Sequence, residues 1–391
     1  MRTIRDLPLD GRRVFIRVDF NVPIENGAIT DDTRIRSALP TITFAIDHGA
    51  TVILASHLGR PKGAPNPKYS LQPIANHLGK LLRRSVTFAP DCVGPAATKA
   101  VADHPRGVIV LENLRFHAEE EQNEAKFAQA LAGLADVYIN DAFGAAHRAH
   151  ASTEGIARYL KDKAAGFLMA AEVEYLGRVL HKPDHPFVAI LGGAKVSDKL
   201  EVIQNFLGKV DALLIGGAMA YTFLKAADQP VGASLVESDL LDTARQVVAR
   251  ARQCGIDLEL PVDHVVAPRI DPAAPTATLA IGDPSIGDRM GLDVGPETVA
   301  RYAGIIGRAK TVVWNGPMGV FEIEAFAQGT IGIAHAVANV HGTTIVGGGD
   351  SVAAVGRAGV SDRITHISTG GGASLEFLGG RTLPGIEALG V

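Results

Sequence analysis

The stretch FVAILGGAKVSDKLEVIQNFL, residues 187–207, decides the fold class of this chain. Its first five residues are all apolar, as expected for a buried strand, and Gly192 and Gly193 then end the run. The residues that follow repeat an apolar side chain at helical spacing, at Val196, Leu200, Ile203 and Leu207. A fully apolar strand followed by an amphipathic helix is typical of a parallel sheet that helices cover on both faces.

The same alternation continues along the chain on both sides of this stretch. Apolar runs of strand length occur at Val14–Val18, Thr51–Ala55, Val108–Leu111, Val137–Ile139, Phe187–Leu191, Ala212–Ile215, Thr311–Trp314, Thr343–Val346 and Ile364–Ile367. The segment Ala170–Pro186 has a helical apolar face followed by a break that contains prolines. We therefore expect an α/β protein with two similar-sized domains, residues 1–169 and 187–372. Each would be a Rossmann-like parallel sheet with helices on both faces, and residues 170–186 would form the hinge helix and linker.

The composition excludes several classes of protein. A chain of 391 residues is too long to fold around one ordinary core. Its content of 47% hydrophobic and 20% charged residues excludes a disordered chain. The formal net charge of -4 provides no overall basic field, so we expect no nucleic-acid partner. No apolar run approaches the roughly 18 residues of a membrane span, and the charged segment Met1–Arg13 does not resemble a signal peptide. Cys92 and Cys254 are too few and too distant for a zinc cluster, and they favour a reducing, cytoplasmic setting.

Polar residues follow the predicted strands of the first half, where an open parallel sheet binds its ligands. They are Asp19-Phe20-Asn21, His57-Leu58-Gly59-Arg60, Glu112-Asn113-Leu114-Arg115 and Asn140-Asp141, with Arg34, His147, Arg148 and His150 nearby in the sequence. Guanidinium groups bind oxyanions through two parallel hydrogen bonds, and Asp19 with Asn21 suits a hydroxyl group. We expect a site for a small, multiply anionic, hydroxylated molecule. For His147 and His150, a purely structural hydrogen-bonding role remains an equal alternative.

The strand ends of the second half carry glycines instead. They are Gly192-Gly193-Ala194-Lys195, Gly216-Gly217, Asn315-Gly316-Pro317, Gly347-Gly348-Gly349-Asp350 and Thr369-Gly370-Gly371-Gly372. Glycine allows the backbone to approach phosphate closely, and main-chain N–H groups at helix starts then donate to it. The pattern favours a nucleotide site. It contains neither the G-x-x-x-x-G-K-[ST] signature of P-loop enzymes nor the G-x-G-x-x-G fingerprint of dinucleotide binders.

Lysine, aspartate and glutamate residues near these glycines could also contact a nucleotide. Lys195 and Lys199 are four residues apart, which on a helix beginning near Val196 would place both on one face, where a polyanion would offset their repulsion. Asp350 follows three glycines and could hold Mg²⁺ on a phosphate chain. Glu322 could accept hydrogen bonds from ribose hydroxyls. Two anion sites on two domains, with lysines, arginines and a metal carboxylate, favour phosphoryl transfer after the domains close.

The motifs resemble those of one family, phosphoglycerate kinase. The resemblance runs in order from residue 17 to about residue 380. It rests on Arg17-Val-Asp-Phe-Asn-Val-Pro23, His57-Leu-Gly-Arg-Pro61, Glu112-Asn-Leu-Arg-Phe116, Asn140-Asp-Ala-Phe-Gly144, His147-Arg-Ala-His-Ala-Ser152, Gly192-Gly-Ala-Lys-Val-Ser-Asp-Lys199, Trp314-Asn-Gly-Pro-Met-Gly-Val-Phe-Glu322, Gly347-Gly-Gly-Asp-Ser351 and Ser368-Thr-Gly-Gly-Gly-Ala373.

The resemblance implies a glycolytic kinase: a reversible, Mg²⁺-dependent transfer between 1,3-bisphosphoglycerate and ADP that yields 3-phosphoglycerate and ATP. It implies a cytoplasmic monomer whose residues 373–391 return to the N-terminal domain. The implied substrate-binding residues are Asp19, Phe20, Asn21, Arg34, His57, Leu58, Gly59, Arg60, Arg115 and Arg148. The implied nucleotide-binding residues are Lys199, Gly291, Asn315, Glu322, Gly348, Gly349, Asp350 and Ser351, with Asp350 as the metal ligand. The implied catalytic residues are Arg34, Lys195, Lys199, Gly371 and Gly372.

One departure and two rival functions accompany this resemblance. Asp288-Arg289 stands where the family usually has a Gly-Trp pair, before Met290-Gly291-Leu292-Asp293, so we expect a different adenine-side wall. An oxidoreductase with a dinucleotide in the second domain is one rival, and the missing glycine fingerprint counts against it. A non-enzymatic nucleotide or phosphometabolite sensor is the other, although the transfer residues Arg34, Lys195, Lys199 and Asp350 are all present.

Overall fold

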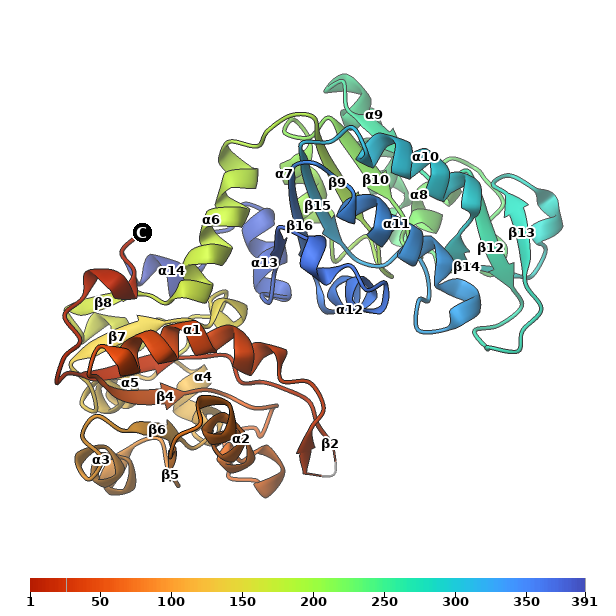
Figure 1. The fold of residues 1–391 in the computed structure, drawn as a ribbon. Coiled ribbons are helices and arrows are strands. Elements are labelled where there is room, and N and C mark those ends of the chain that lie inside the picture. The colour runs from red at the N-terminus through yellow and green to blue at the C-terminus, as the bar shows by residue number, and fades with distance from the viewer. Residues whose placement is uncertain (26, 391) are drawn as a thin grey trace. The chain divides into compact units, whose positions relative to one another are not determined.

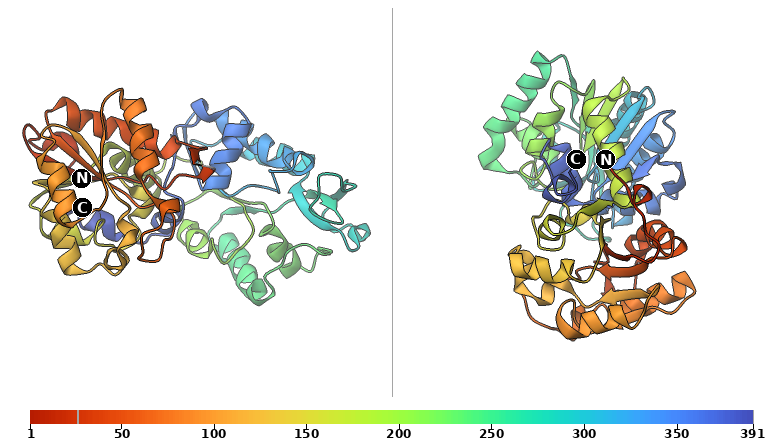
Figure 2. Two further views of the ribbon diagram at one scale, coloured as in Figure 1. Left: turned by 90° about the horizontal axis from the view of Figure 1, so that it is seen from below. Right: turned by 90° about the vertical axis from the view of Figure 1, so that its left-hand side faces the viewer.

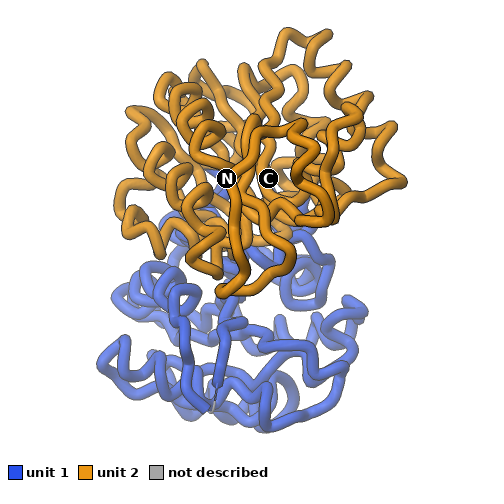
Figure 3. The backbone as a smooth tube through the Cα atoms, turned by 90° about the vertical axis from the view of Figure 1, so that its right-hand side faces the viewer, with its two compact units in different colours: residues 1–174, 382–391 blue, residues 175–381 orange. Residues whose placement is uncertain are grey.

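The computed structural model describes residues 1–25 and 27–390, which form two compact units (Figure 3). Unit 1 comprises Met1–Glu174 together with Thr382–Val391, and unit 2 comprises Tyr175–Arg381. Each unit contains one large parallel sheet with its own core, as the alternation of apolar strands and helices predicted.

The sheet of unit 1 has the strand order β5-β6-β4-β1-β7-β8, and every neighbouring pair is parallel (Figure 1). Its strands are β1 (Arg13–Arg17), β4 (Thr51–Ala55), β5 (Thr87–Ala89), β6 (Val108–Leu111), β7 (Val137–Asn140) and β8 (Asp162–Ala165). A separate two-stranded hairpin consists of β2 (Ile24–Glu25) and β3 (Ala28–Ile29).

Helices cover both faces of this sheet (Figures 1 and 2). They are α1 (Thr33–Asp47), α2 (Gln72–Leu82), α3 (Gly94–Ala102), α4 (Ala118–Glu121), α5 (Ala125–Ala132) and α14 (Pro384–Glu387). Val14 and Val52 on one face pack in a cluster with Ile35 of α1 and Ile74 of α2. Residues of the opposite face, such as Phe15, are equally buried, so the central strands are buried on both faces.

The large sheet of unit 2 has the order β11-β10-β9-β15-β16-β17 and is also parallel. Its strands are β9 (Phe187–Leu191), β10 (Ala212–Ile215), β11 (Asp257–Glu259), β15 (Thr311–Asn315), β16 (Thr343–Gly347) and β17 (His366–Ile367). The helices of unit 2 are α7 (Leu200–Phe206), α8 (Ala220–Ala226), α9 (Leu241–Gln253), α10 (Pro296–Ile306), α11 (Gln328–Ala338), α12 (Gly349–Arg357) and α13 (Gly372–Leu378). Trp314 of β15 is fully buried and packs in one cluster with residues of α10, α11 and α12.

A smaller antiparallel sheet in unit 2 was not predicted. It has the order β13-β12-β14, formed by β12 (Asp263–Ala267), β13 (Ala277–Ala280) and β14 (Met290–Val294). Strand β13 is nowhere fully buried, and β14 contains a glycine and an aspartate, so neither shows the continuous apolar run of a central strand. This sheet supplies one wall of a cavity described below.

The division between the units falls inside one helix, α6 (Phe167–His181), between Glu174 and Tyr175. We expected residues 170–186 to separate the domains and residues 373–391 to return to the first domain; in the structure, the segment that groups with unit 1 begins at Thr382. Helix α13 groups with unit 2, where Asn205 of α7 donates a 2.6 Å hydrogen bond to the Leu378 carbonyl. Among the described residues, no helix has both the length and the apolar composition that crossing a membrane requires.

The start of α10 depends on a carboxylate from another strand. The N-cap residue of α10 is Gly295, which has no side chain to accept the first helical N–H groups. Asp263 of β12 replaces it: its carboxylate accepts from the backbone N–H of Glu297 at 2.9 Å and of Thr298 at 2.7 Å. The Asp263 side chain is buried, so water cannot take its place.

We predict that Asp263→Ala lowers the free energy of unfolding by about 2 kcal/mol, the upper end of the range for a lost N-cap. Urea unfolding followed by circular dichroism measures this loss. The control is Asp283→Ala, which removes a carboxylate that accepts from Ser285 N–H in an exposed turn and should cost less. Equal losses in the two variants would contradict the role given to Asp263.

Candidate active site

The first group of polar residues lies at the carboxyl ends of β1 and β4, which are neighbours in the sheet of unit 1. Arg34, from the first turn of α1, donates a 3.0 Å hydrogen bond to the Asn21 carbonyl and pairs with the Asp19 carboxylate at 3.3 Å. The Asn21 side chain in turn accepts from the Gly59 N–H at 2.9 Å. The structure therefore joins Asp19, Asn21, Arg34 and Gly59 in one network.

Arg115, which follows β6, extends this network. It donates a 2.9 Å hydrogen bond to the Gly59 carbonyl and lies 3.3 Å from the Glu121 carboxylate. Only 6% of its side chain is exposed. Burial lowers the pKa of Arg115, and the charges of Arg17 and Arg148 act in the same direction. The positive charges of Arg17 and Arg148 act on the buried Arg115 guanidinium, and an anion bound here would offset them.

A fully buried arginine sets the protonation of His57. Arg17 Nη2 lies 3.1 Å from His57 Nδ1, and Arg17 Nε donates to Ser152 Oγ at 2.8 Å. Since a guanidinium only donates, Nδ1 must accept, and the ring proton is assigned to Nε2. Burial, followed by the charges of Arg17, Arg115 and Arg34, lowers the pKa of His57 well below its usual value. His57 is therefore a neutral imidazole with a fixed Nε2–H donor.

Arg17, Ser152 and Glu120 were not predicted as functional residues. Ser152 Oγ donates a 2.5 Å hydrogen bond to the buried Glu120 carboxylate, which links that carboxylate to Arg17. The sequence held a signal for Arg17, because it is the only charged residue in the apolar run Val14–Val18. Glu120 gave no such signal, since it is the middle one of three consecutive glutamates.

The remaining predicted residues of unit 1 occupy different positions. The side chains of Phe20 and Leu58 are buried in the core, so only their backbones can contact a ligand. Arg60 is exposed beside Gly59, and Arg148 is half-buried. His150 is buried, and burial, with the charges of Arg115, Arg17 and Arg148, lowers its pKa to about 3. Within the described part of the chain, the buried His150 Nδ1 has no hydrogen-bond partner, so the hydrogen bond of the structural alternative is not seen at this atom.

Several of the predicted glycines of unit 2 line a cavity of about 610 Å³. It lies at the carboxyl ends of β9, β15 and β16 and at the N-termini of α12 and α13. Gly348 precedes α12 with a φ of 90°, a left-handed conformation that disfavours other residues. The predicted residues that line this cavity are Lys195, Lys199, Asn315, Gly348, Gly349, Asp350, Ser351, Gly371 and Gly372. Helix N-termini with exposed N–H groups favour an anionic ligand here.

Two polar side chains in this cavity also indicate an anion. Lys199 is buried and donates to Asn315 Oδ1. Burial lowers the pKa of Lys199 to about 8, although Asp198 and Asp350 act in the opposite direction. Within the described part of the chain, the buried Asn315 Nδ2 has no hydrogen-bond acceptor. An anion would satisfy this donor and stabilise the charged lysine.

The expected lysine pair on one helical face is incorrect. Helix α7 begins at Leu200, so Lys199 is its N-cap residue and Lys195 lies in the preceding loop, where it is exposed. Residues before the helix form a turn because the Glu237 carboxylate accepts from Val196 N–H at 2.5 Å and from Ser197 Oγ at 2.6 Å. The buried face of α7 consists of Val202, Ile203 and Phe206.

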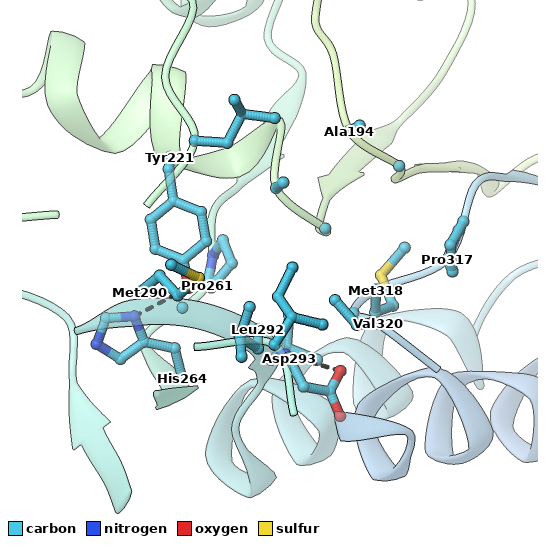
Figure 4. Close-up of a pocket in the computed structure, with 18 of the residues that line it drawn as sticks. Ala194, Tyr221, Pro261, His264, Met290, Leu292, Asp293, Pro317, Met318 and Val320 are labelled. Carbon is cyan, nitrogen blue, oxygen red and sulfur yellow. Dashed lines mark hydrogen bonds between the residues drawn. The ribbon is translucent and has the colours of Figure 1, made fainter. Parts of the chain in front are cut away.

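A second cavity, of about 350 Å³, is largely apolar (Figure 4). Tyr221, Met290, Leu292, Met318 and Val320 line it, together with Gly291 and the exposed Glu322 at its edge. Asp350 and Pro317 line both cavities, so the apolar cavity adjoins the polar one. One flat apolar group and a phosphate chain could therefore bind side by side.

Three residues of the apolar cavity were not predicted to be functional. The Tyr221 hydroxyl lies 3.0 Å from His264 Nδ1, and a side chain at Gly291 would overlap the Tyr221 ring, which explains the glycine there (Figure 4). Asp293 is buried, and burial raises its pKa to about 7. Arg289, expected to alter the wall, is not among the lining residues; its guanidinium bonds to the Ser285 and Ile286 carbonyls.

The chain is similar to known proteins over nearly its whole length. The family profile of phosphoglycerate kinase matches residues 4–381. The phosphoglycerate kinase of Koribacter versatilis is 58% identical, covering 99% of this chain and 98% of that protein. The one of Moorella thermoacetica is 59% identical with the same coverage. The solved structure of phosphoglycerate kinase from Coxiella burnetii is 44% identical, with a TM-score of 0.90 over 99% of this chain and 98% of that one. The structure from Pyrococcus horikoshii is 35% identical, with a TM-score of 0.88 over 100% and 98%.

The pKa of Lys199 leads to a prediction about proton linkage. An anion bound in the polar cavity would raise this pKa above about 8. If ADP places its phosphates there, its binding should take up protons at about pH 8.5 and few at about pH 7. Affinity for ADP should therefore decline as the pH rises past 8. Titration calorimetry in two buffers with different ionisation enthalpies measures the proton uptake.

Two variants distinguish the contribution of Lys199 to proton uptake from that of Lys195. Lys199→Met should abolish the extra proton uptake at about pH 8.5 and weaken ADP binding, whereas Lys195→Met should retain the uptake. If Lys199→Met kept the full proton uptake, another group would be responsible for the linkage.

Proposed function

This chain belongs to the phosphoglycerate kinase family, and from that premise we propose that its two groups of site residues bind the two substrates of the reaction. The chain is an enzyme, and its activity is the ATP-generating step of glycolysis that this family catalyses. The phosphoryl group passes from 1,3-bisphosphoglycerate to ADP, which leaves 3-phosphoglycerate and ATP. A coupled assay of ATP formation from these two substrates tests the activity directly.

The observation that carries the assignment is the chemical contrast between the two sets of strand ends. Those of unit 1 present arginines and a histidine, whereas those of unit 2 present glycine backbone beside one buried lysine. We assign the glycerate to unit 1. Arg34, Arg60, Arg115 and Arg148 would bind its carboxylate and phosphate, Asp19 and Asn21 its hydroxyl, and Phe20, Leu58 and Gly59 would contribute backbone groups. His57, with its proton on Nε2, would donate without adding a charge.

We assign the nucleotide to the two cavities of unit 2. The apolar cavity of about 350 Å³ suits the base, with Gly291 on its wall and Glu322 at its edge for the ribose hydroxyls. The polar cavity of about 610 Å³ suits the phosphate chain, which Lys199, Asn315 and Gly348–Ser351 would contact. The unpaired Asn315 Nδ2 supports this placement, because a phosphate oxygen would give it an acceptor.

Asp350 fits the requirements of a magnesium ligand. Its carboxylate is exposed and lines both cavities, next to the place assigned to the phosphates. Mg²⁺ prefers one or two carboxylates together with phosphate oxygens, and when bound it neutralises phosphate charge. We propose Asp350 as the residue that holds it.

The transferring phosphoryl group carries negative charge that the protein must stabilise. We propose that Arg34, Lys195 and Lys199 supply positive charge in the ternary complex and that the N–H groups at Gly371 and Gly372 donate to the phosphoryl oxygens. The ligands must meet for transfer, so we also propose that the chain bends near α6, where the division between the units falls, and that closure excludes water.

The cellular setting and the oligomeric state complete the proposal. Cys92 and Cys254 are both free, which is consistent with a reducing cytoplasm. We propose that the enzyme acts there as a monomer, because each proposed ligand position uses residues of this one chain. Neither a nucleic acid nor a membrane has a role in this scheme.

The assignment of ligands to units predicts selective loss of one affinity. Arg148→Ala should weaken 3-phosphoglycerate binding by about 1.5–3 kcal/mol, the range for hydrogen bonds to charged groups. ADP binding should be nearly unchanged, because Arg148 belongs to unit 1. Calorimetry with each ligand measures both affinities. Loss of ADP affinity with intact 3-phosphoglycerate affinity would reverse the assignment.

The role of Asp350 predicts a dependence on magnesium. Asp350→Asn preserves size and hydrogen bonding but removes the charge that would hold Mg²⁺, so turnover should fall steeply and excess Mg²⁺ should restore only part of it. Glu376→Gln serves as the control, because Glu376 is another carboxylate of the polar cavity without a proposed metal role. Normal turnover of Asp350→Asn at limiting Mg²⁺ would show that another residue holds the metal.

A further inference from the structure

Three side chains that the reaction does not use meet beyond the end of β5. Asp91 and Cys92 lie in the loop between β5 and α3, and His117 is the N-cap residue of α4. One carboxylate oxygen, the thiol sulfur and one imidazole nitrogen all lie within 4.8 Å of one another. Among residues 1–25 and 27–390, no other group of three such side chains lies this close.

The hydrogen bonds within the Asp91–Cys92–His117 cluster already hold the donors in place. His117 Nε2 lies 2.8 Å from Asp91 Oδ1, and the same oxygen accepts from the Cys92 backbone N–H at 2.7 Å. The His117 ring packs 5.2 Å from the Phe127 ring, which fixes its orientation. Ligands oriented in advance lose little freedom when a metal ion binds.

The cluster is closed on one side and open on the other. Cys92 is only 1% exposed, whereas the side chains of Asp91 and His117 are 43% and 29% exposed. An ion could therefore enter past the carboxylate and the imidazole and contact the sulfur beneath them. A site with three protein ligands would then keep its fourth position for water.

The surrounding charges favour a cation. Burial, followed by the carboxylates of Asp91, Glu120 and Glu112, raises the pKa of the Cys92 thiol well above its usual value. Without a compensating ion, this sulfur remains a protonated, inert thiol. A divalent cation would stabilise the thiolate and reduce the repulsion among these acidic groups.

We propose that Asp91, Cys92 and His117 form a binding site for one divalent cation of the zinc type. Thiolate and imidazole are ligands of Zn²⁺ and related ions, whereas Mg²⁺ requires hard oxygen ligands. The site therefore discriminates against the Mg²⁺ that accompanies the nucleotide. On binding, the Cys92 S–H bond breaks, the sulfur bonds to the metal, and its proton leaves to solvent. If the metal takes His117 Nε2, the proton that this nitrogen donates to Asp91 moves to Nδ1, so one proton is released in all.

Cobalt provides the direct test, because Co²⁺ takes the place of Zn²⁺ and a thiolate ligand gives it a charge-transfer absorption band. The full-length protein, freed of metal by chelation, is titrated with Co²⁺ at neutral pH. The Cys254→Ser variant is the decisive sample: the chain has two cysteines, so Cys92 is then its only thiol. We expect the thiolate band, one bound ion and release of one proton in both wild type and Cys254→Ser.

Variants of the ligands complete the test, with Zn²⁺ affinity measured by equilibrium dialysis. Cys92→Ser and His117→Gln should each weaken Zn²⁺ binding by about 10-fold or more, while excess Mg²⁺ should not displace the ion. Circular dichroism checks that each variant is folded. If Cys92→Ser does not fold, the band in Cys254→Ser together with its loss in His117→Gln supports the site. Absence of a thiolate band in Cys254→Ser, or a band that disappears only when Cys254 is removed, would overturn the proposal.

Discussion

A parallel sheet covered on both faces leaves only the ends of its strands for polar side chains. In each unit the central strands of the sheet are buried on both faces, so a charged group inside them would need a buried partner. Most residues assigned to a substrate accordingly lie at or after the end of a strand or at the start of a helix. Both units have a parallel sheet of this kind, so each has its polar residues at the strand ends. The residues at those ends differ between the units, and the two groups of residues therefore differ in chemistry.

Arg17 is the exception, and its surroundings show how such an exception is stabilised. It is the last residue of β1 and is fully buried, yet each side of its guanidinium group has a partner. Ser152 connects it to Glu120, the Val18 carbonyl accepts from Nη1, and His57 accepts from Nη2. These contacts offset the cost of burying the guanidinium, and they fix the orientation of the one histidine assigned to the substrate. Removing any member would leave a buried polar group without its partner.

The sequence predicted the central strands well because burial on both faces leaves an unmistakable pattern. The predicted run Thr51–Ala55 coincides with β4, and Phe187–Leu191 coincides with β9. Strands with mixed composition were missed, such as β8, which begins Asp-Lys. The start of α7 was wrong because Glu237, some 40 residues later in the sequence, determines it. Single side chains were predictable where composition was unusual, and contacts between distant segments such as Arg17 and Glu120 were not.

The way the chain divides between the units also determines when each can be completed. Unit 2 is one continuous stretch, Tyr175–Arg381, whereas unit 1 needs residues from both sides of it. In Figure 1, the blue helix α14 lies with the red and yellow elements of unit 1, where Gly385 N–H donates to the Ala146 carbonyl and the Gly385 carbonyl accepts from Asn140. During synthesis on the ribosome, unit 1 therefore cannot be completed until the whole of unit 2 and the residues from Thr382 onward have been made.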